Sequence, residues 1–152
     1  MVTVYVWKHY LSHMSVGHAA MEVDGGVPQG SAYLSWWPSG GNIVEKVYLS
    51  TTPTVHQNLQ EDIAKERRQP DCVIRIEGLD ESKIKAYWRS WWPHGRYSGL
   101  NLSCATTVGN ALMVGGGTRF TTGWVHKQHW TPEDCALLAS QIKGKSEAHG
   151  PR

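Results

Sequence analysis

Apolar and polar residues alternate with a period of two in the first third of the chain, which is typical of β-strands. In residues 2–7, valines alternate with threonine, tyrosine and tryptophan. The pattern resumes in residues 17–23 and is interrupted by Asp24-Gly-Gly. We therefore expect a hairpin between 17–23 and a strand over 31–37, with a further strand over 43–49. The first half of the chain predicts mainly antiparallel sheet.

Helical spacing dominates the second half. Residues 58–68 are polar and contain helix-forming residues, so we expect an exposed helix there, followed by a strand over 72–76. Apolar residues then recur at i, i+3, i+4 and i+7, which predicts an amphipathic helix that begins near Asp80 and ends before Pro93. The apolar side of that helix consists of Ile84, Tyr87, Trp88 and Trp91.

A last helix is predicted from Thr131, with Pro132 at its first position and acidic residues in its first turn, as far as about Lys143. We expect a single domain over residues 1–143 and a disordered tail over 144–152. A chain of 152 residues can bury a core without metals or disulfides. The predicted fold class is α/β (α+β), an antiparallel sheet with packed helices.

Composition excludes several classes of function. The net charge is only +2, without a basic stripe, so no nucleic-acid partner is expected. Three widely spaced cysteines without a CxxC pair indicate neither a disulfide framework nor a structural zinc site. No apolar run reaches the roughly 20 residues of a membrane span, and the first residues lack the features of a signal peptide. We expect a protein made in the cytoplasm, with no membrane anchor and no cofactor.

One cysteine stands where a reactive thiol belongs. Cys104 lies between a loop and a predicted short helix, with Ser103 as the N-cap and glycines from Gly115 at the other end. The unpaired N–H groups and the dipole of such a helix would favour the thiolate of Cys104 and could also hold an oxyanion. A packed core thiol is the alternative interpretation.

A cysteine nucleophile needs a base and a group that orients the base. Of eight histidines, His18 is the best placed, because it opens a strand directly after Gly17 among small residues. The polar residue roughly opposite it in the predicted hairpin is Ser35. Glu22, on the same strand face as His18, is the competing orienting residue.

His18 on a strand, a polar residue on the next strand and Cys104 at a helix start follow one another along the chain. This order resembles the circularly permuted papain-like fold, which is shared by NlpC-type peptidoglycan peptidases and lecithin:retinol acyltransferase-like enzymes. Four segments carry a closer resemblance: Val16-Gly-His-Ala-Ala-Met-Glu22, Tyr33-Leu-Ser-Trp-Trp-Pro38, Tyr97-Ser-Gly-Leu-Asn-Leu-Ser-Cys-Ala-Thr-Thr-Val-Gly-Asn-Ala-Leu112 and Trp130-Thr-Pro-Glu-Asp134. They are similar to cysteine hydrolase domains of bacterial effector toxins, over almost the whole chain, and the segment around the cysteine carries most of the likeness.

The resemblance implies that Cys104 is the nucleophile and His18 the base of a cysteine peptidase or amidase, with the third role falling to Ser35. Ser103 stands where such proteins tend to carry asparagine. The tryptophan doublet Trp36-Trp37, with Ser103, is expected to line a substrate groove, although core packing is the commoner role of tryptophan.

The expected substrates are peptidoglycan stem peptides or a target-cell protein. Delivery by a dedicated machine such as type VI secretion is expected, with secretion machinery and an immunity protein as possible partners. A protein deamidase, a lipid acyltransferase and a non-enzymatic tryptophan-rich binding module, which would use Trp36, Trp37, Trp91 and Trp92, remain alternatives. A zinc site built from His9, His13, His18 and Cys104 is a further hypothesis, although no HExxH motif accompanies it.

Overall fold

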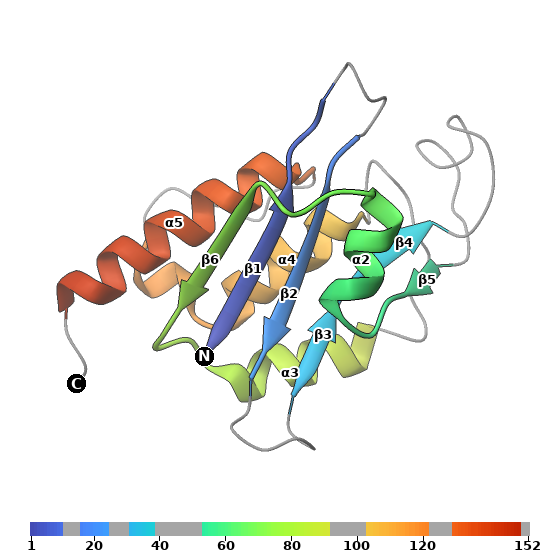
Figure 1. Ribbon diagram of the computed structural model, residues 1–152. Helices are drawn as coiled ribbons and strands as arrows, with labels where there is room; N and C mark the ends of the chain where they lie inside the picture. The colour runs from blue at the N-terminus through green and yellow to red at the C-terminus, as the bar shows by residue number, and fades with distance from the viewer. Residues whose placement is uncertain (11–15, 25–30, 39–52, 92–102, 122–128, 150–152) are drawn as a thin grey trace.

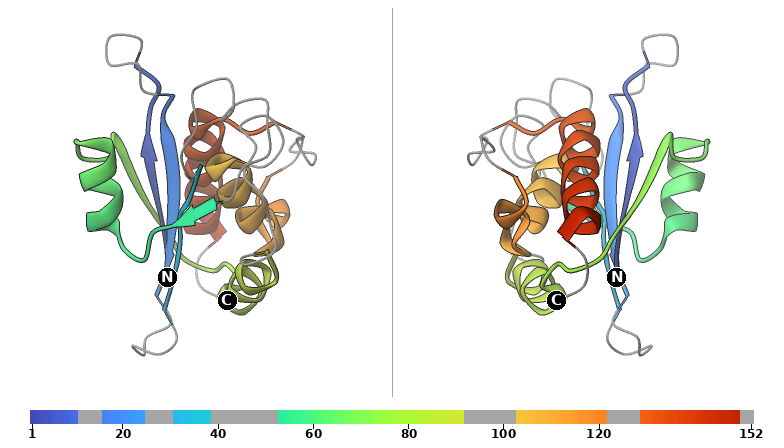
Figure 2. Two further views of the ribbon diagram at one scale, coloured as in Figure 1. Left: turned by 90° about the vertical axis from the view of Figure 1, so that its right-hand side faces the viewer. Right: turned by 90° about the vertical axis from the view of Figure 1, so that its left-hand side faces the viewer.

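A four-stranded antiparallel sheet lies between two layers of helices (Figures 1 and 2). The computed structural model describes residues 1–10, 16–24, 31–38, 53–91, 103–121 and 129–149. Figure 2 shows the sheet on edge, with α2 on one face and α3, α4 and α5 on the other. The elements are β1 (Val2–Trp7), β2 (His18–Val23), β3 (Ala32–Leu34), β4 (Trp36–Pro38), β5 (Pro53–Val55), α2 (Leu59–Glu66), β6 (Cys72–Ile76), α3 (Glu81–Trp91), α4 (Cys104–Val114), a 3₁₀ turn (Gly117–Arg119) and α5 (Pro132–His149).

In the described sheet, one end of β2 is paired on one side only. The strand order is β3-β2-β1-β6, and β2 pairs with β1 over its full length, so that His18 lies opposite Trp7. On its other side, β2 pairs with β3 only from Met21 to Val23. His18 therefore stands at a point where, among the described strands, only one edge of β2 is covered.

The two sheet faces have different cores. The valines of β1 and their neighbours on β2 pack against α4 and α5 in the main core. Almost all of α4 is buried there, and a Cβ added to Gly109 would lie 2.4 Å from the ring of Trp130. The opposite face carries Tyr5, Trp7 and Ala20, which α2 covers. Alternation of side chains along β2 turns His18 toward this second face.

Most predicted elements are confirmed, including the strands over 2–7 and 72–76 and the helices that begin near Asp80 and at Cys104. The strand expected over 31–37 is instead two short strands. It divides at Ser35, because β3 pairs with β2 whereas β4 turns away to pair with β5. The strand expected over 43–49 lies outside the described residues.

The last helix extends further than the sequence predicted. α5 continues through Gly144 to His149, beyond the end near Lys143 that the sequence predicted for this helix. A single glycine costs a helix only about 1 kcal/mol. The added turns gain an i, i+4 ion pair between Lys143 and Glu147, at 3.9 Å, and a bond from the Ser146 hydroxyl to the Lys143 carbonyl. No helix in the described ranges has the length and apolar character needed to cross a bilayer.

Candidate active site

Cys104 is the first residue of α4, as the sequence predicted. The preceding Ser103 is extended, and its Oγ accepts the backbone N–H of Thr106 at 3.3 Å, which confirms it as the N-cap. The Ser103 carbonyl accepts the N–H of Thr107. Cys104 is 6% exposed and Ser103 is buried within the cap. Ser103 therefore shapes the start of the helix, and its expected place in a substrate groove stays a prediction.

His18 is buried between two indole rings. Its ring stacks on Trp37 with centroids 4.0 Å apart and is tilted against Trp7 at 5.4 Å. Burial by itself lowers the pKa of His18, but the Cys104 thiolate and the Asp62 carboxylate outweigh it and raise the pKa to about 9. The imidazole is thus held between a thiol and a carboxylate, and its charged form is stabilised.

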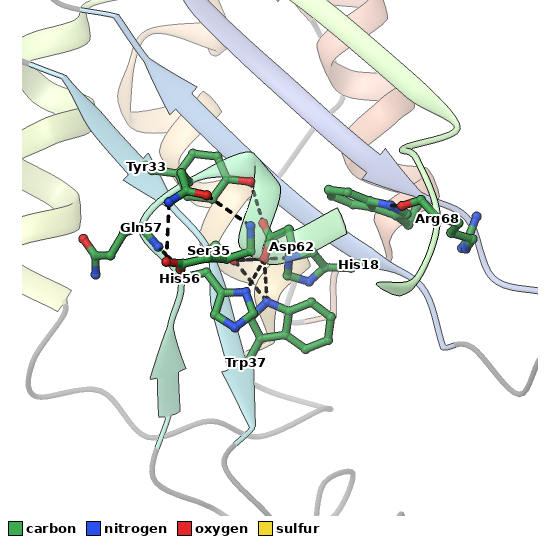
Figure 3. Close-up of polar contacts among 11 residues, drawn as sticks. His18, Tyr33, Ser35, Trp37, His56, Gln57, Asp62 and Arg68 are labelled. Carbon is green, nitrogen blue, oxygen red and sulfur yellow. Dashed lines mark hydrogen bonds and ion pairs between the residues drawn. The ribbon is translucent and has the colours of Figure 1, made fainter. Parts of the chain in front are cut away.

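Asp62 is the centre of the polar network in Figure 3. It lies in α2, has no exposed surface, and its Oδ2 is 3.4 Å from His18 Nε2. Four further groups surround the carboxylate. They are Tyr33 Oη on Oδ2 at 2.5 Å and, on Oδ1, Ser35 Oγ at 2.7 Å, Trp37 Nε1 at 2.8 Å and His56 Nδ1 at 2.7 Å.

The surroundings of Asp62 keep it ionised. Burial opposes the charge, but hydrogen bonding and attraction from His18, followed by the hydroxyls of Tyr33 and Ser35, hold the pKa of Asp62 well below its usual range. Burial and the Asp62 charge raise the pKa of Tyr33 far above its ordinary value, so its hydroxyl stays protonated as a donor. A buried charge with this many donors is well compensated.

Trp37 belongs to the site in a different way from the one predicted. Its ring lies between two imidazoles, those of His18 and, at 5.5 Å, His56. Its Nε1 also approaches Ser35 Oγ at 3.1 Å, besides donating to Asp62. Because its Nε1 bonds Asp62 and Ser35 while its ring contacts both imidazoles, Trp37 helps to hold these four side chains in their positions.

Trp36, which was expected in the groove, is a core residue of the described structure. It is 2% exposed and packs edge-on against Trp88 of α3, at 6.0 Å, in the main core. Neighbouring residues of a strand point to opposite faces, so Trp36 and Trp37 reach different layers.

The structure places both predicted orienting residues. Ser35 Oγ lies 3.3 Å from His18 Nε2, within the predicted reach, and it donates to Asp62 in turn. The Glu22 carboxylate accepts the Tyr5 hydroxyl at 2.7 Å and is not among the described contacts of His18. The carboxylate that does reach the imidazole is Asp62, which sequence reasoning missed.

Asp62 was missed because α2 was expected to be an exposed helix. Leu59 and Ile63 of this helix pack on the aromatic face of the sheet. Asp62 falls between them at helical spacing, one acidic residue on the short apolar side of a polar helix. That placement was the available signal for a buried carboxylate.

The zinc hypothesis gains no support from the arrangement. His9 is exposed, and its backbone N–H donates to the Glu133 carboxylate. His13 lies outside the described residues. Within the described parts of the chain, no three His, Cys, Asp or Glu side chains gather closely enough to hold a metal ion.

The cysteines differ in their surroundings, and those described here are all free thiols. Cys135 is fully buried in α5, and its Sγ donates to the Ala105 carbonyl at 3.2 Å. Burial, with the nearby Cys104 charge, raises the pKa of Cys135 well above its ordinary value. Among the described residues, Cys104 is the cysteine whose charge and hydrogen bonding act on a histidine, His18.

Comparison with known proteins gives one partial match. Residues 1–71 are similar to the family described as the IcsB middle domain. The matched part includes His18, Ser35, His56 and Asp62 and ends before Cys104. No curated protein and no solved structure matches the chain significantly.

Proposed function

We propose that the protein is a cysteine hydrolase of the permuted papain-like type that cleaves an amide bond through a thioester on Cys104. The observation that carries the proposal is the convergence of three groups from separate elements. His18 Nε2 of β2 lies 3.4 Å from the buried Asp62 carboxylate of α2, and the Cys104 thiol at the start of α4 is near enough to raise the pKa of His18 by charge and hydrogen bonding. A nucleophile, a base and an orienting group in this order are the requirements of covalent acyl chemistry.

The catalytic cycle follows from these contacts. His18 Nε2 faces Ser35 and Asp62, which leaves Nδ1 to take the thiol proton. The Cys104 thiolate attacks the amide carbon, and His18 returns the proton to the leaving amine as the C–N bond breaks. Water, deprotonated by His18, then attacks the thioester. The products are a carboxylic acid and the restored thiol.

The helix that carries Cys104 supplies the charge stabilisation. The Ser103 cap uses the N–H groups of Thr106 and Thr107. The N–H groups of Cys104 and Ala105, which precede Thr106 in the first turn, would then donate to the oxyanion of the tetrahedral intermediate. These donors are fixed by the helix before the substrate binds.

Asp62, in place of Ser35, is assigned the orienting role. A carboxylate stabilises the imidazolium by charge as well as by position, whereas a hydroxyl provides position alone. Ser35 is a positioning residue that bonds both partners. Tyr33, Trp37 and His56 hold the carboxylate in place.

The biological setting we propose is a bacterial effector toxin. The match of residues 1–71 to the IcsB middle domain, a bacterial effector family, supports this setting. Delivery would use a dedicated secretion machine, and the substrate would be a peptidoglycan stem peptide or a target-cell protein.

Mass spectrometry of products tests the proposal. Purified sacculi and target-cell lysate are incubated separately with the wild-type protein, with Cys104→Ala and with Cys72→Ala as a matched control. We expect a changed muropeptide profile or a cleaved protein with wild type and Cys72→Ala, and no change with Cys104→Ala. Equal products from wild type and Cys104→Ala would overturn the thiol mechanism. An amine-linked acyl group in place of an acid would identify the acceptor as an amine.

A further inference from the structure

A cleft of about 520 Å³ opens beside the short strand β3, between α3, β5 and the start of α2. This volume lies within the range of roughly 300–1,000 Å³ that ligand sites take in proteins. Its described lining includes neither Cys104, His18 nor Asp62. Tyr33 connects the cleft to the candidate active site, because it lines the cleft and its hydroxyl donates to Asp62.

The α3 wall of the cleft is basic. Lys85 and Arg89 are one helical turn apart, so both side chains project from the same side of α3. Neither forms an ion pair with another residue in the described part of the chain. The acidic residue in the described lining is Glu22, whose carboxylate accepts the Tyr5 hydroxyl. The cleft therefore has an excess of positive charge available to a ligand.

The remaining lining is partly apolar and partly formed by the edge strand β3. Val55, Leu59 and Trp88 contribute apolar surface. β3 is the last strand in the described sheet order, and its residues Ala32 and Tyr33 line the cleft, so an extended peptide in the cleft would lie beside a strand at the edge of the described sheet. Extended peptides with both charged and apolar side chains fit such a lining.

We propose that this cleft is a recognition site for a short acidic segment of a protein substrate, in which an acidic residue neighbours an apolar one. The proposal rests on the proposed function and names its substrate class. Carboxylates of the segment would pair with Lys85 and Arg89, and the apolar side chain would cover Leu59 and Trp88. Peptidoglycan stems also carry carboxylates, but they lack large apolar side chains, so a protein segment fits both walls better.

Binding is measured by fluorescence anisotropy on the full chain carrying Cys104→Ala, which separates recognition from chemistry. The probe is a fluorescein-labelled pentapeptide with two glutamates flanking a leucine, and the comparison peptide has glutamines in their place. We expect the glutamate peptide to bind roughly tenfold more tightly at low salt, as two partly exposed ion pairs would give. The double substitution Lys85→Glu/Arg89→Glu should remove that preference.

A control variant carries the same change of charge elsewhere. Lys65→Glu/Lys83→Glu replaces two side chains that are not part of the cleft lining, and it should keep most of the preference. If both double variants lose the preference for the glutamate peptide equally, the preference depends only on net charge, and the proposed site is wrong. Equal binding of the two peptides by the unaltered cleft would also overturn it, as would stronger competition by a peptidoglycan stem tripeptide than by the unlabelled glutamate peptide.

Failure of the site and failure of the proposed function are distinguishable. The rate at which iodoacetamide alkylates Cys104 depends on the thiol and its base, and it should be unchanged in Lys85→Glu/Arg89→Glu. If peptide selectivity is absent while Cys104 still forms acyl products, the cleft assignment is wrong and the hydrolase stands. If selectivity is present while Cys104→Ala yields the same products as wild type, the chemistry is wrong.

Discussion

Replacing Asp62 with asparagine should disable the base while changing almost no volume. His18 Nε2 and Asp62 Oδ2 are 3.4 Å apart. At an effective dielectric constant of about 20, two unit charges at this distance attract by roughly 5 kcal/mol, before the cost of burying them is subtracted. Without this attraction, the pKa of His18 should fall from about 9 toward its ordinary value of roughly 6.5 or below.

The amide should also change the tautomer of His18. Trp37 and His56 both bond Oδ1, so the amide oxygen belongs at that position. Its NH₂ group then takes the place of Oδ2 and points a donor at His18 Nε2. A neutral imidazole accepts there only if its proton is on Nδ1, the nitrogen assigned to the thiol. We expect turnover to fall by roughly 10³–10⁴-fold, as for other bases held in the wrong tautomer.

Two measurements check this without a known substrate. Imidazole NMR titration should show the lowered pKa of His18, and alkylation of Cys104 at pH 6–8 should slow by about tenfold or more because less thiolate is paired with imidazolium. Glu22→Gln makes the same chemical change on a carboxylate that bonds Tyr5, and it should alter neither result. An Asp62→Asn protein that is folded, with an unchanged His18 titration and alkylation rate, would refute the assignment.

Three further experiments test other parts of the account. Ser35→Ala should keep measurable turnover with a shifted pH profile, losing about tenfold, because Asp62 still carries the charge; complete inactivity with an intact fold would contradict this. Iodoacetamide near neutral pH should label Cys104 well before Cys72 and Cys135, although Cys72 is the more exposed thiol, and equal labelling of all three measured by peptide mass spectrometry would count against a reactive thiol. Gly109→Ala should lower the free energy of unfolding in urea by roughly 1–3 kcal/mol, because its Cβ meets a tryptophan ring at 2.4 Å, whereas Gly144→Ala, with nothing within 4 Å, should raise it by up to about 1 kcal/mol.

Stability should depend on pH through His18 and Asp62. The pKa of His18 is raised in the folded state, so its contribution is present in full below about 6.5 and is lost as the pH rises through about 9. The pKa of Asp62 is lowered, so its contribution is present above about 4 and is lost as the pH falls into the strongly acidic range. His18→Gln should therefore flatten the alkaline side of the urea stability profile. An alkaline side as steep as that of wild type would contradict the raised pKa.

Local signals in the sequence predicted much of this fold. The alternation in β1 and the serine before Cys104 depend on neighbours in the chain, so strand and N-cap could be recognised without tertiary information. The hairpin also brought Ser35 within reach of His18, although the ladder between β2 and β3 ends before either residue.

The missed features depend on tertiary placement. Asp62 is buried only because α2 lies against the tyrosine and tryptophan side chains of the sheet. The mostly polar sequence of α2 does not predict that it packs against this face. Trp36 and Trp37 are adjacent in sequence, but the strand sends one into the core and the other against His18. The sequence therefore predicted the thiol and the imidazole as site residues, while the buried carboxylate beside the imidazole required the fold.

The most direct test of the account is detection of the covalent intermediate. The protein is mixed briefly with target-cell lysate or sacculi, and the reaction is quenched in acid. After digestion, the mass of the peptide that contains Cys104 is measured by mass spectrometry. We predict an acyl addition on Cys104 that hydroxylamine removes, as expected for a thioester, and that is absent when His18 is replaced by alanine in a folded protein. An unmodified Cys104 in a protein that still generates product would contradict the central claim.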